Sequence, residues 1–213
     1  ELFMKFPHEV QTEILFNLLE QAEDTQWGKR YNFANIKSFK DFQENVPLCF
    51  YEDIEPLVDR LRKGEKDMLW PGEIKWFAKS SGTTNSKSKF IPVSQQALED
   101  THFKGGKDLL SIYSNLYEDT KIFAGSNLRL GGSTYENDKK NNSYYGDVSG
   151  IIIENLPFWV EMRSTPSNKI SLMNEWEAKI EAIATTSIKE DVASIAGVPS
   201  WMLVLLNRIL EKS

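Results

Sequence analysis

Residues 192–198 limit the fold of this chain more strongly than any other segment. They form an unbroken run of small and apolar residues, Val-Ala-Ser-Ile-Ala-Gly-Val, which Pro199 and Ser200 end. A run that does not alternate between polar and apolar residues is typical of a strand covered on both faces in a parallel sheet. Parallel strands require long crossover connections, usually helices. The run therefore predicts a fully buried, parallel strand in an α/β fold.

Other segments support this fold class because strand and helix patterns alternate along the chain. Strand patterns occur at residues 74–79, 90–93 and 121–130. Apolar residues at helical spacing occur at residues 8–22, 94–115, 170–184 and 201–210. Pro92 places the second strand at a sheet edge, because proline cannot donate a ladder hydrogen bond. The polar residues 133–143 predict an exposed loop, and Gly105-Gly106 predicts a close backbone approach within a helix.

The first third of the chain has a different pattern, in which short helices follow one another. Ser38 is a suitable N-cap for a helix that runs to Glu44. Another helix begins near Tyr51 or Asp53, and Gly64 ends it. We therefore predict a helical lead-in at residues 1–70 and an α/β portion at residues 71–213. No linker separates the two, so both are expected to belong to one incomplete domain.

Charge and composition exclude several classes of function. Thirty-one acidic and 25 basic residues give a net charge of −6, and the basic residues are scattered, so a nucleic-acid partner is not expected. The single cysteine allows neither an internal disulfide nor a thiolate zinc site, and the two histidines lack metalloprotease spacing. We expect no metal site and a cytoplasmic location. The longest apolar run, residues 201–206, is too short to span a membrane.

One segment has the composition of a ligand-binding loop, Ser80 to Lys89. It carries six hydroxyl side chains, one glycine and two lysines between two predicted strands. Hydroxyls and backbone amides donate hydrogen bonds to phosphate oxygens, Gly82 allows a close backbone approach, and lysines neutralise phosphate charge. The loop therefore has the composition to bind a triphosphate. A flexible hairpin tip without a ligand has the same composition, and composition alone does not choose between these two interpretations.

The segment Phe77 to Ser94, FAKSSGTTNSKSKFIPVS, resembles the phosphate-binding signature of adenylate-forming enzymes. Together with VPLCFYEDIEPLVDRLRKGE before it and SIAGVPSWMLVLLNRIL after it, it resembles the auxin-responsive Gretchen Hagen family of acyl-acid amido synthetases, and most of all their bacterial members. The resemblance extends over nearly the whole chain. It implies that the α/β portion is part of the large N-terminal domain of an adenylate-forming ligase.

The resemblance implies a two-step reaction. ATP, which normally arrives with Mg²⁺, and a carboxylic acid form an acyl-adenylate, and the amine of an amino acid then attacks the activated carbonyl. The residues expected to bind the nucleotide are those of the loop: Ser80, Ser81, Gly82, Thr83, Thr84, Lys87 and Lys89. The acid and the amino acid are the implied small-molecule partners.

Family members are more than twice as long as this chain, and their adenine- and AMP-contacting motifs lie downstream. We therefore expect an N-terminal fragment that contains no catalytic residues, is inactive alone, and has the rest of its parent chain as a partner. Two alternatives stay open. One is a non-catalytic nucleotide-binding or scaffold module, and the other is an adenylate-forming ligase with a thiol acceptor.

A few residues outside the loop are further candidates. Val198 and Trp201 lie between the buried strand and a helix, where ligands bind in open α/β sheets, so they are weak candidates for the wall of an acid pocket. Core packing is an equal alternative for Trp201. Gly131-Gly132 after a strand is either a plain turn or a ligand approach. Cys49 is expected to be a buried packing residue, and His102 is expected to have a helix-surface or packing role.

Overall fold

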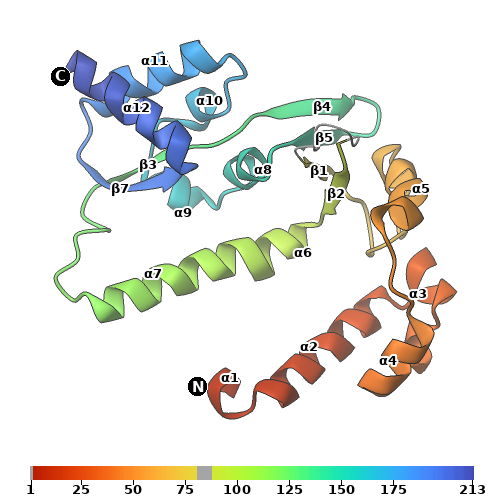
Figure 1. The fold of residues 1–213 in the computed structure, drawn as a ribbon. Coiled ribbons are helices and arrows are strands. Elements are labelled where there is room, and N and C mark those ends of the chain that lie inside the picture. Colours follow the sequence, from red (N-terminus) through yellow and green to blue (C-terminus); the bar gives the residue numbers. More distant parts are fainter. Residues whose placement is uncertain (1, 81–87) are drawn as a thin grey trace. The chain divides into compact units, whose positions relative to one another are not determined.

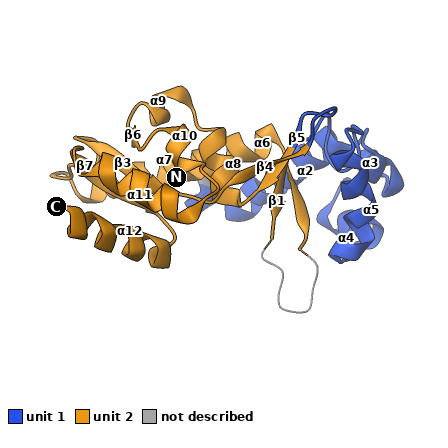
Figure 2. Cartoon of the chain, turned by 90° about the horizontal axis from the view of Figure 1, so that it is seen from above, with its two compact units in different colours: residues 1–75, 138–143 blue, residues 76–137, 144–213 orange. Residues whose placement is uncertain are grey.

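The computed structural model describes residues 2–80 and 88–213. It divides the chain into two compact units, coloured separately in Figure 2. The first unit comprises residues 1–75 with 138–143, and the second comprises residues 76–137 with 144–213. Each unit is described by itself below.

The first unit is built from helices, as the sequence predicts for this region (Figure 1). The helices are α1 (Leu2–Lys5), α2 (Pro7–Ala22), α3 (Gln26–Arg30), the 3₁₀ helix η1 (Phe33–Asn35), α4 (Phe39–Asn45) and α5 (Tyr51–Arg62). Ser38 caps α4 as predicted, because its Oγ accepts a 3.0 Å hydrogen bond from the Asp41 amide. The turn after α5 contains Gly64 at φ +88°, a conformation that favours glycine.

Thr25 connects two helices of this unit. Its Oγ1 donates to the Ala22 carbonyl at the end of α2 (2.7 Å) and accepts from the Gly28 amide at the start of α3 (2.9 Å). Thr25 is almost fully buried. One hydroxyl thus satisfies polar backbone groups at both helix ends.

The second unit contains two sheets, which confirms the predicted α/β class (Figure 1). The first sheet has the order β2-β1-β5-β4, and the second has the order β6-β3-β7. Their strands are β1 (Trp76–Lys79), β2 (Phe90–Val93), β3 (Ser126–Leu130), β4 (Thr134–Asp138), β5 (Ser143–Gly146), β6 (Ser164–Thr165) and β7 (Val192–Gly197). The proline-containing β2 lies at an edge, as predicted.

Helices pack on both sheets and create two apolar clusters. These helices are α6 (Gln95–Ala97), the π-helix η2 (Leu98–Phe103), α7 (Lys104–Leu116), α8 (Val148–Glu154), α9 (Phe158–Glu161), α10 (Asn168–Ser171), α11 (Trp176–Ser187) and α12 (Pro199–Lys212). One cluster joins Ala78 of β1 to Leu98 and Ile151. The other joins Leu128 and Leu130 of β3 to side chains of α11 and α12, including Ile183 and Leu205.

The strand at residues 192–198 is parallel, as predicted, but it is not fully buried. β7 pairs with β3 in parallel and lies at the end of its sheet. Ile195 is 55% exposed and Val198 is 42% exposed. The prediction of full burial is wrong because an apolar run reports what a strand can tolerate, whereas its place in the sheet decides which side is covered.

Three further expectations are corrected. Residues 133–143 are not simply a loop, because β4 and the start of β5 lie there; pairing within the sheet overrides the low strand propensity of these polar residues. The helical pattern at residues 170–184 forms two helices, α10 and α11, instead of one. No described atom lies within 4 Å of a Cβ built on Gly105 or Gly106, so no backbone approaches this pair among the described residues. Within residues 2–80 and 88–213, no helix is long and apolar enough to cross a bilayer.

Candidate functional site

The ends of the predicted phosphate loop are held together by the hairpin of β1 and β2. These strands pair antiparallel, and the pairs run from Trp76 with Val93 to Lys79 with Phe90. The Ser80 amide then donates to the Lys89 carbonyl (2.9 Å), and the Lys89 amide donates to the Ser80 Oγ (3.0 Å). The structure therefore brings the first and last predicted residues together. The remaining loop candidates lie outside the described residues: Ser81, Gly82, Thr83, Thr84 and Lys87.

An aromatic cluster around Tyr145 supports this stem. The Tyr145 ring of β5 contacts Phe90 edge-to-face at 5.7 Å and stacks on Tyr135 at 5.4 Å between ring centroids. The Lys79 ammonium lies 5.8 Å from the centroid of the same ring, a cation–π geometry. The cluster supports the strand ends next to the loop, and the Lys79 ammonium adds a positive charge there. Sequence analysis did not identify Tyr145 as a member of the site, although the adjacent tyrosines 144 and 145 are visible in the sequence.

The loop leaves the sheet at an edge where ligands commonly bind. β1 is parallel to β5, and Ala78 pairs with Gly146. Ser80 therefore follows β1 at the same edge where Asp147 follows β5. In open α/β sheets, ligands bind beyond the carboxyl ends of parallel strands. Asp147 is exposed at this edge.

The connection between β3 and β4, residues Gly131 to Ser133, packs tightly against the same region. The Ser133 amide donates to Asp147 Oδ2 (3.4 Å), and the Asp147 amide donates to the Ser133 carbonyl (3.2 Å). The Gly132 amide donates to Ser149 Oγ at 2.9 Å. A Cβ on Gly132 would lie 2.1 Å from Asp147 Oδ2, and one on Gly131 would lie 2.5 Å from Ile153 Cδ1. The two glycines thus allow protein to pack on protein in a connection without a turn, so the turn interpretation of this pair is wrong.

Lys179 of α11 contacts the connection at residues 131–133 and is only 2% exposed. Its Nζ donates to the Gly131 carbonyl (3.1 Å), the Gly132 carbonyl (3.4 Å) and Ser133 Oγ (3.3 Å). Burial lowers the pKa of Lys179 below its ordinary range, and the negative charge of Asp147 opposes that shift. Sequence analysis did not identify Lys179, because a lysine in an amphipathic helix is usually solvent-exposed.

The other predicted site residues lie in ordinary packing or surface positions. Trp201 contacts Trp176 edge-to-face at 5.3 Å and packs against the cluster under the second sheet. A pocket role for Val198 and Trp201 stays a prediction. His102 is exposed on the π-helix, in line with a helix-surface role. Cys49 is exposed and the prediction of a buried cysteine is wrong, because residues 47–50 form an exposed segment between α4 and α5.

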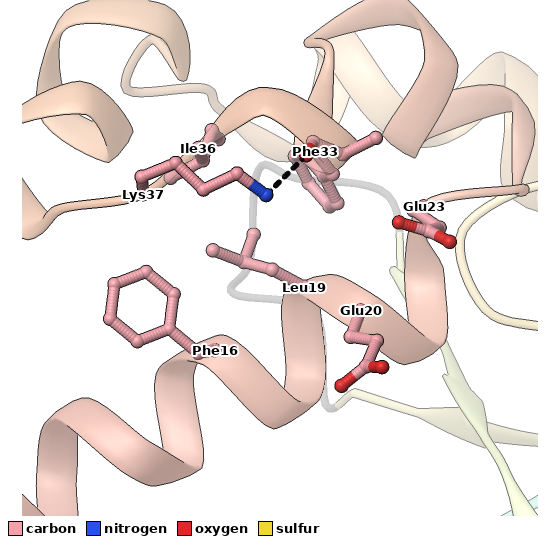
Figure 3. Close-up of a pocket in the computed structure, with 8 residues that line it drawn as sticks. Phe16, Leu19, Glu20, Glu23, Phe33, Ile36 and Lys37 are labelled. Atoms are coloured by element: carbon pink, nitrogen blue, oxygen red, sulfur yellow. Dashed lines mark hydrogen bonds between the residues drawn. The ribbon is translucent and has the colours of Figure 1, made fainter.

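The first unit contains a pocket of about 410 Å³ (Figure 3). Leu19 and Ile36 form part of its apolar lining, and Glu20 and Glu23 of α2 also line it. The Lys37 ammonium donates to the Ala34 carbonyl at 2.8 Å (Figure 3). Of the described residues predicted to bind nucleotide or acid, none lines this pocket. Among residues 2–80 and 88–213, no group of three or more histidine, cysteine, aspartate or glutamate residues is arranged to hold a metal ion.

Comparison with known families shows which family this chain belongs to. The sequence profile described as the GH3 family N-terminal domain matches residues 1–213. The chain belongs to the GH3 family. This confirms the family that the loop and its flanking segments predicted.

Curated GH3 proteins are similar to this chain over about half its length. A jasmonoyl–L-amino acid synthetase of Oryza sativa subsp. japonica is 30% identical over 102 residues, which are 47% of this chain and 18% of that protein. An indole-3-acetic acid-amido synthetase of Arabidopsis thaliana is 30% identical over 94 residues, which are 44% of this chain and 17% of that protein. The aligned regions therefore make up less than a fifth of these relatives.

Solved structures share the fold over nearly the whole chain. The GH3.15 acyl acid amido synthetase has a TM-score of 0.73 and 20% identity, and the match covers 95% of this chain and 36% of that protein. A second structure, of AtGH3.15 in complex with 2,4-DB, has a TM-score of 0.71 with the same coverage. The GH3 chain described here thus spans about a third of the length of these synthetases.

Proposed function

We propose that this chain is the nucleotide-binding N-terminal part of an ATP-dependent ligase that joins a carboxylic acid to the amine of an amino acid. The observation that carries the proposal is the closed stem of the hydroxyl-rich loop, where Ser80 and Lys89 pair at the carboxyl edge of β1. Membership of the GH3 family supports the reaction, because the curated relatives are named as a jasmonoyl–L-amino acid synthetase and an indole-3-acetic acid-amido synthetase.

The proposed chemistry overcomes the poor electrophilicity of a carboxylate. In the first step, a carboxylate oxygen forms a bond to the α-phosphorus of ATP and pyrophosphate leaves. In the second step, the amine forms a bond to the acyl carbon, AMP leaves with the C–O bonding electrons, and the amine loses a proton. The chain described here contributes to the first step, because binding the β- and γ-phosphates holds the α-phosphorus in place for attack.

The stem has features that fit a triphosphate. Backbone amides and hydroxyls donate to phosphate oxygens, and the Lys79 ammonium at the base of the stem adds positive charge. We assign phosphate binding to the loop residues Ser80, Ser81, Gly82, Thr83, Thr84, Lys87 and Lys89. Mg²⁺ would enter with the triphosphate, because it is normally bound through substrate phosphates and one or two carboxylates.

The proposal also concerns what the chain does not do alone. The GH3 chain covers 36% of a solved synthetase, so we propose that the rest of its parent protein supplies the catalytic groups and that residues 1–213 do not complete adenylation. We propose a cytoplasmic location and no nucleic-acid or membrane partner. A thiol acceptor, or a module that only binds nucleotide, would be distinguished by the products that the parent protein forms.

Equilibrium ATP binding to the parent protein tests the assignment of the loop. Thr83→Ala and Lys89→Ala each remove a proposed phosphate contact, and loss of a hydrogen bond to a charged group costs about 1.5–3 kcal/mol, or roughly 10- to 150-fold in affinity. Lys189→Ala is the matched control. Lys189 is exposed, and it precedes the amino end of β7 in the second sheet, whereas the loop follows the carboxyl end of β1 in the first sheet. We expect unchanged affinity in the control. Unchanged affinity in the two loop variants, with an unchanged melting temperature, would contradict the assignment.

A further inference from the structure

A buried ammonium group lies at the centre of the junction between the two sheets of the second unit. Lys179 is 2% exposed, and its three hydrogen-bond acceptors all belong to the connection at residues 131–133. No described carboxylate forms an ion pair with it at 4.0 Å or less. Burying a charged group is costly unless it is both paired and hydrogen-bonded, and Lys179 has hydrogen bonds without such an ion pair, so this position needs an explanation beyond core packing.

The connection at residues 131–133 also forms hydrogen bonds with residues other than Lys179. Ser133 Oγ donates to the Met173 carbonyl (2.9 Å) and accepts from Lys179 Nζ. Two hydrogen bonds join the same connection to Asp147: the Ser133 amide donates to the Asp147 carboxylate, and the Ser133 carbonyl accepts from the Asp147 amide. The connection is therefore held between Lys179 of α11 and Asp147, which follows β5.

Glycines make this junction unusually close. A Cβ on Gly132 would lie 2.1 Å from Asp147 Oδ2, and one on Gly146 would lie 2.4 Å from the Ser133 carbonyl oxygen. A Cβ on Gly150 would lie 3.1 Å from the same carbonyl. Because the backbones touch directly, a displacement of the connection must displace Asp147 and the end of β5.

The end of β5 is also the neighbour of the loop stem. Gly146 pairs with Ala78 in the parallel β1–β5 ladder, and Ser80 begins two residues later. Adjacent strands lie about 4.8 Å apart, so the backbone at Asp147 is next to the backbone at Lys79. A contiguous series of hydrogen bonds and ladder pairs thus runs from Lys179 through the connection and Asp147 to the base of the loop.

We propose that Lys179 is a positioning residue for nucleotide binding. Lys179 holds the connection at residues 131–133 in place and thereby fixes the position of Asp147 and of the carboxyl edge of β1 and β5. This inference rests on the proposed function, because it takes the loop at this edge to bind ATP. Lys179 itself touches no nucleotide in this account. Its ammonium donates hydrogen bonds to the carbonyls of a buried segment. Water molecules would donate these hydrogen bonds if the segment were exposed.

The test compares Lys179→Met with a core variant of the same helix in the parent protein. Methionine has a similar shape and removes the ammonium, whereas Ile183→Ala removes a fully buried side chain of α11 that contacts the apolar cluster. Both are expected to lower the melting temperature. We expect Lys179→Met to raise the KM for ATP about tenfold or more, because small displacements of positioning groups have large kinetic effects. Ile183→Ala is expected to leave that KM within about twofold, because the Ile183 side chain packs in the apolar cluster and takes no part in the hydrogen-bond series.

Ser133→Ala is a milder second variant, which removes one acceptor of Lys179 and the bond to Met173. We expect a smaller rise in the KM for ATP, about threefold to tenfold, because Lys179 keeps its two carbonyl acceptors. Amide hydrogen exchange of ATP-free protein adds a readout that does not depend on activity. Lys179→Met should accelerate exchange in peptides covering residues 131–133 and 145–150, and Ile183→Ala should not.

The outcomes separate the inference from the function on which it rests. If the wild-type parent binds ATP but Lys179→Met changes the KM no more than Ile183→Ala does, the inference is wrong and the proposed function stands. Unchanged exchange at residues 131–133 and 145–150 in Lys179→Met would also overturn it. If the wild-type parent does not bind ATP, both the proposed function and the positioning role fail.

Discussion

At the scale of single residues, two glycines of the second unit have opposite physical roles. Gly132 lies in the connection between β3 and β4, where a Cβ would be 2.4 Å from the Cβ of Asp147. Gly106 lies in α7, where no described atom is within 4 Å of a Cβ. The first glycine is required by packing, and the second only reduces helix stability.

This contrast gives a prediction for two alanine substitutions. Gly132→Ala should destabilise the protein by about 1–3 kcal/mol, because the new methyl group has to displace Asp147. Gly106→Ala should stabilise it by about 0.5–1 kcal/mol, because alanine has the higher helix propensity. Urea unfolding measures both values. A stabilising Gly132→Ala would show that the junction is looser than described here.

A second prediction concerns the pH dependence of Lys179. Burial lowers its folded-state pKa below the ordinary value of 10.5. Between these two pKa values the unfolded chain binds the proton and the folded chain does not, so the stability contribution of Lys179 rises with pH across this window. The cost of burying the charge is fully present at lower pH.

The free energy of unfolding of the wild type should therefore rise relative to that of Lys179→Met as pH increases towards 10.5. Lys189→Met is the control, since Lys189 is exposed. Urea unfolding at several pH values provides the comparison. A difference between wild type and Lys179→Met that does not change with pH would show that Lys179 is not held in the proposed environment.

Some residue roles follow from local sequence and others do not. Ser38 was predicted as an N-cap, and its hydroxyl accepts a 3.0 Å hydrogen bond from the amide three residues later. Such caps depend only on neighbours in the sequence. Tyr145 and Lys179 obtain their roles from partners more than 40 residues away, such as Phe90 and Gly131. No local pattern indicates contacts of this kind.

At the scale of elements, strand type was easier to predict than strand environment. The run at residues 192–198 predicts a parallel strand, and β7 pairs in parallel with β3. The exposed side chain of Ile195 was not predictable, because it depends on which strand occupies the edge. The hairpin of β1 and β2 was predicted with both strands and the loop between them, because Pro92 and the polar loop mark its ends locally.

Helix α12 provides an element-scale prediction because its two sides differ. Leu205 is fully buried against α11 and β3, whereas Leu203 is 61% exposed. In the 213-residue chain, Leu205→Ala should cost about 2–5 kcal/mol of unfolding free energy, as expected for a large-to-small core change. Leu203→Ala should change it by no more than about 0.5 kcal/mol. Equal effects in urea unfolding would contradict the orientation of α12.

At the scale of the whole molecule, the chain is one part of the GH3 architecture. It matches the N-terminal domain profile over residues 1–213 and spans 36% of the solved GH3.15 synthetase. The family was predictable because its signature is concentrated in the short loop between β1 and β2 and in the segments beside it.

Carboxylic acid-dependent exchange of labelled pyrophosphate into ATP by the parent protein tests the central claim most directly. Exchange requires reversible formation of an acyl-adenylate, so it reports the first step without the amine. We predict exchange with at least one acid of a broad panel, its loss in Thr83→Ala and Lys89→Ala, and none with residues 1–213 alone. Absence of exchange with every acid in a parent protein that is folded and binds ATP would contradict the ligase function and favour a module that only binds nucleotide.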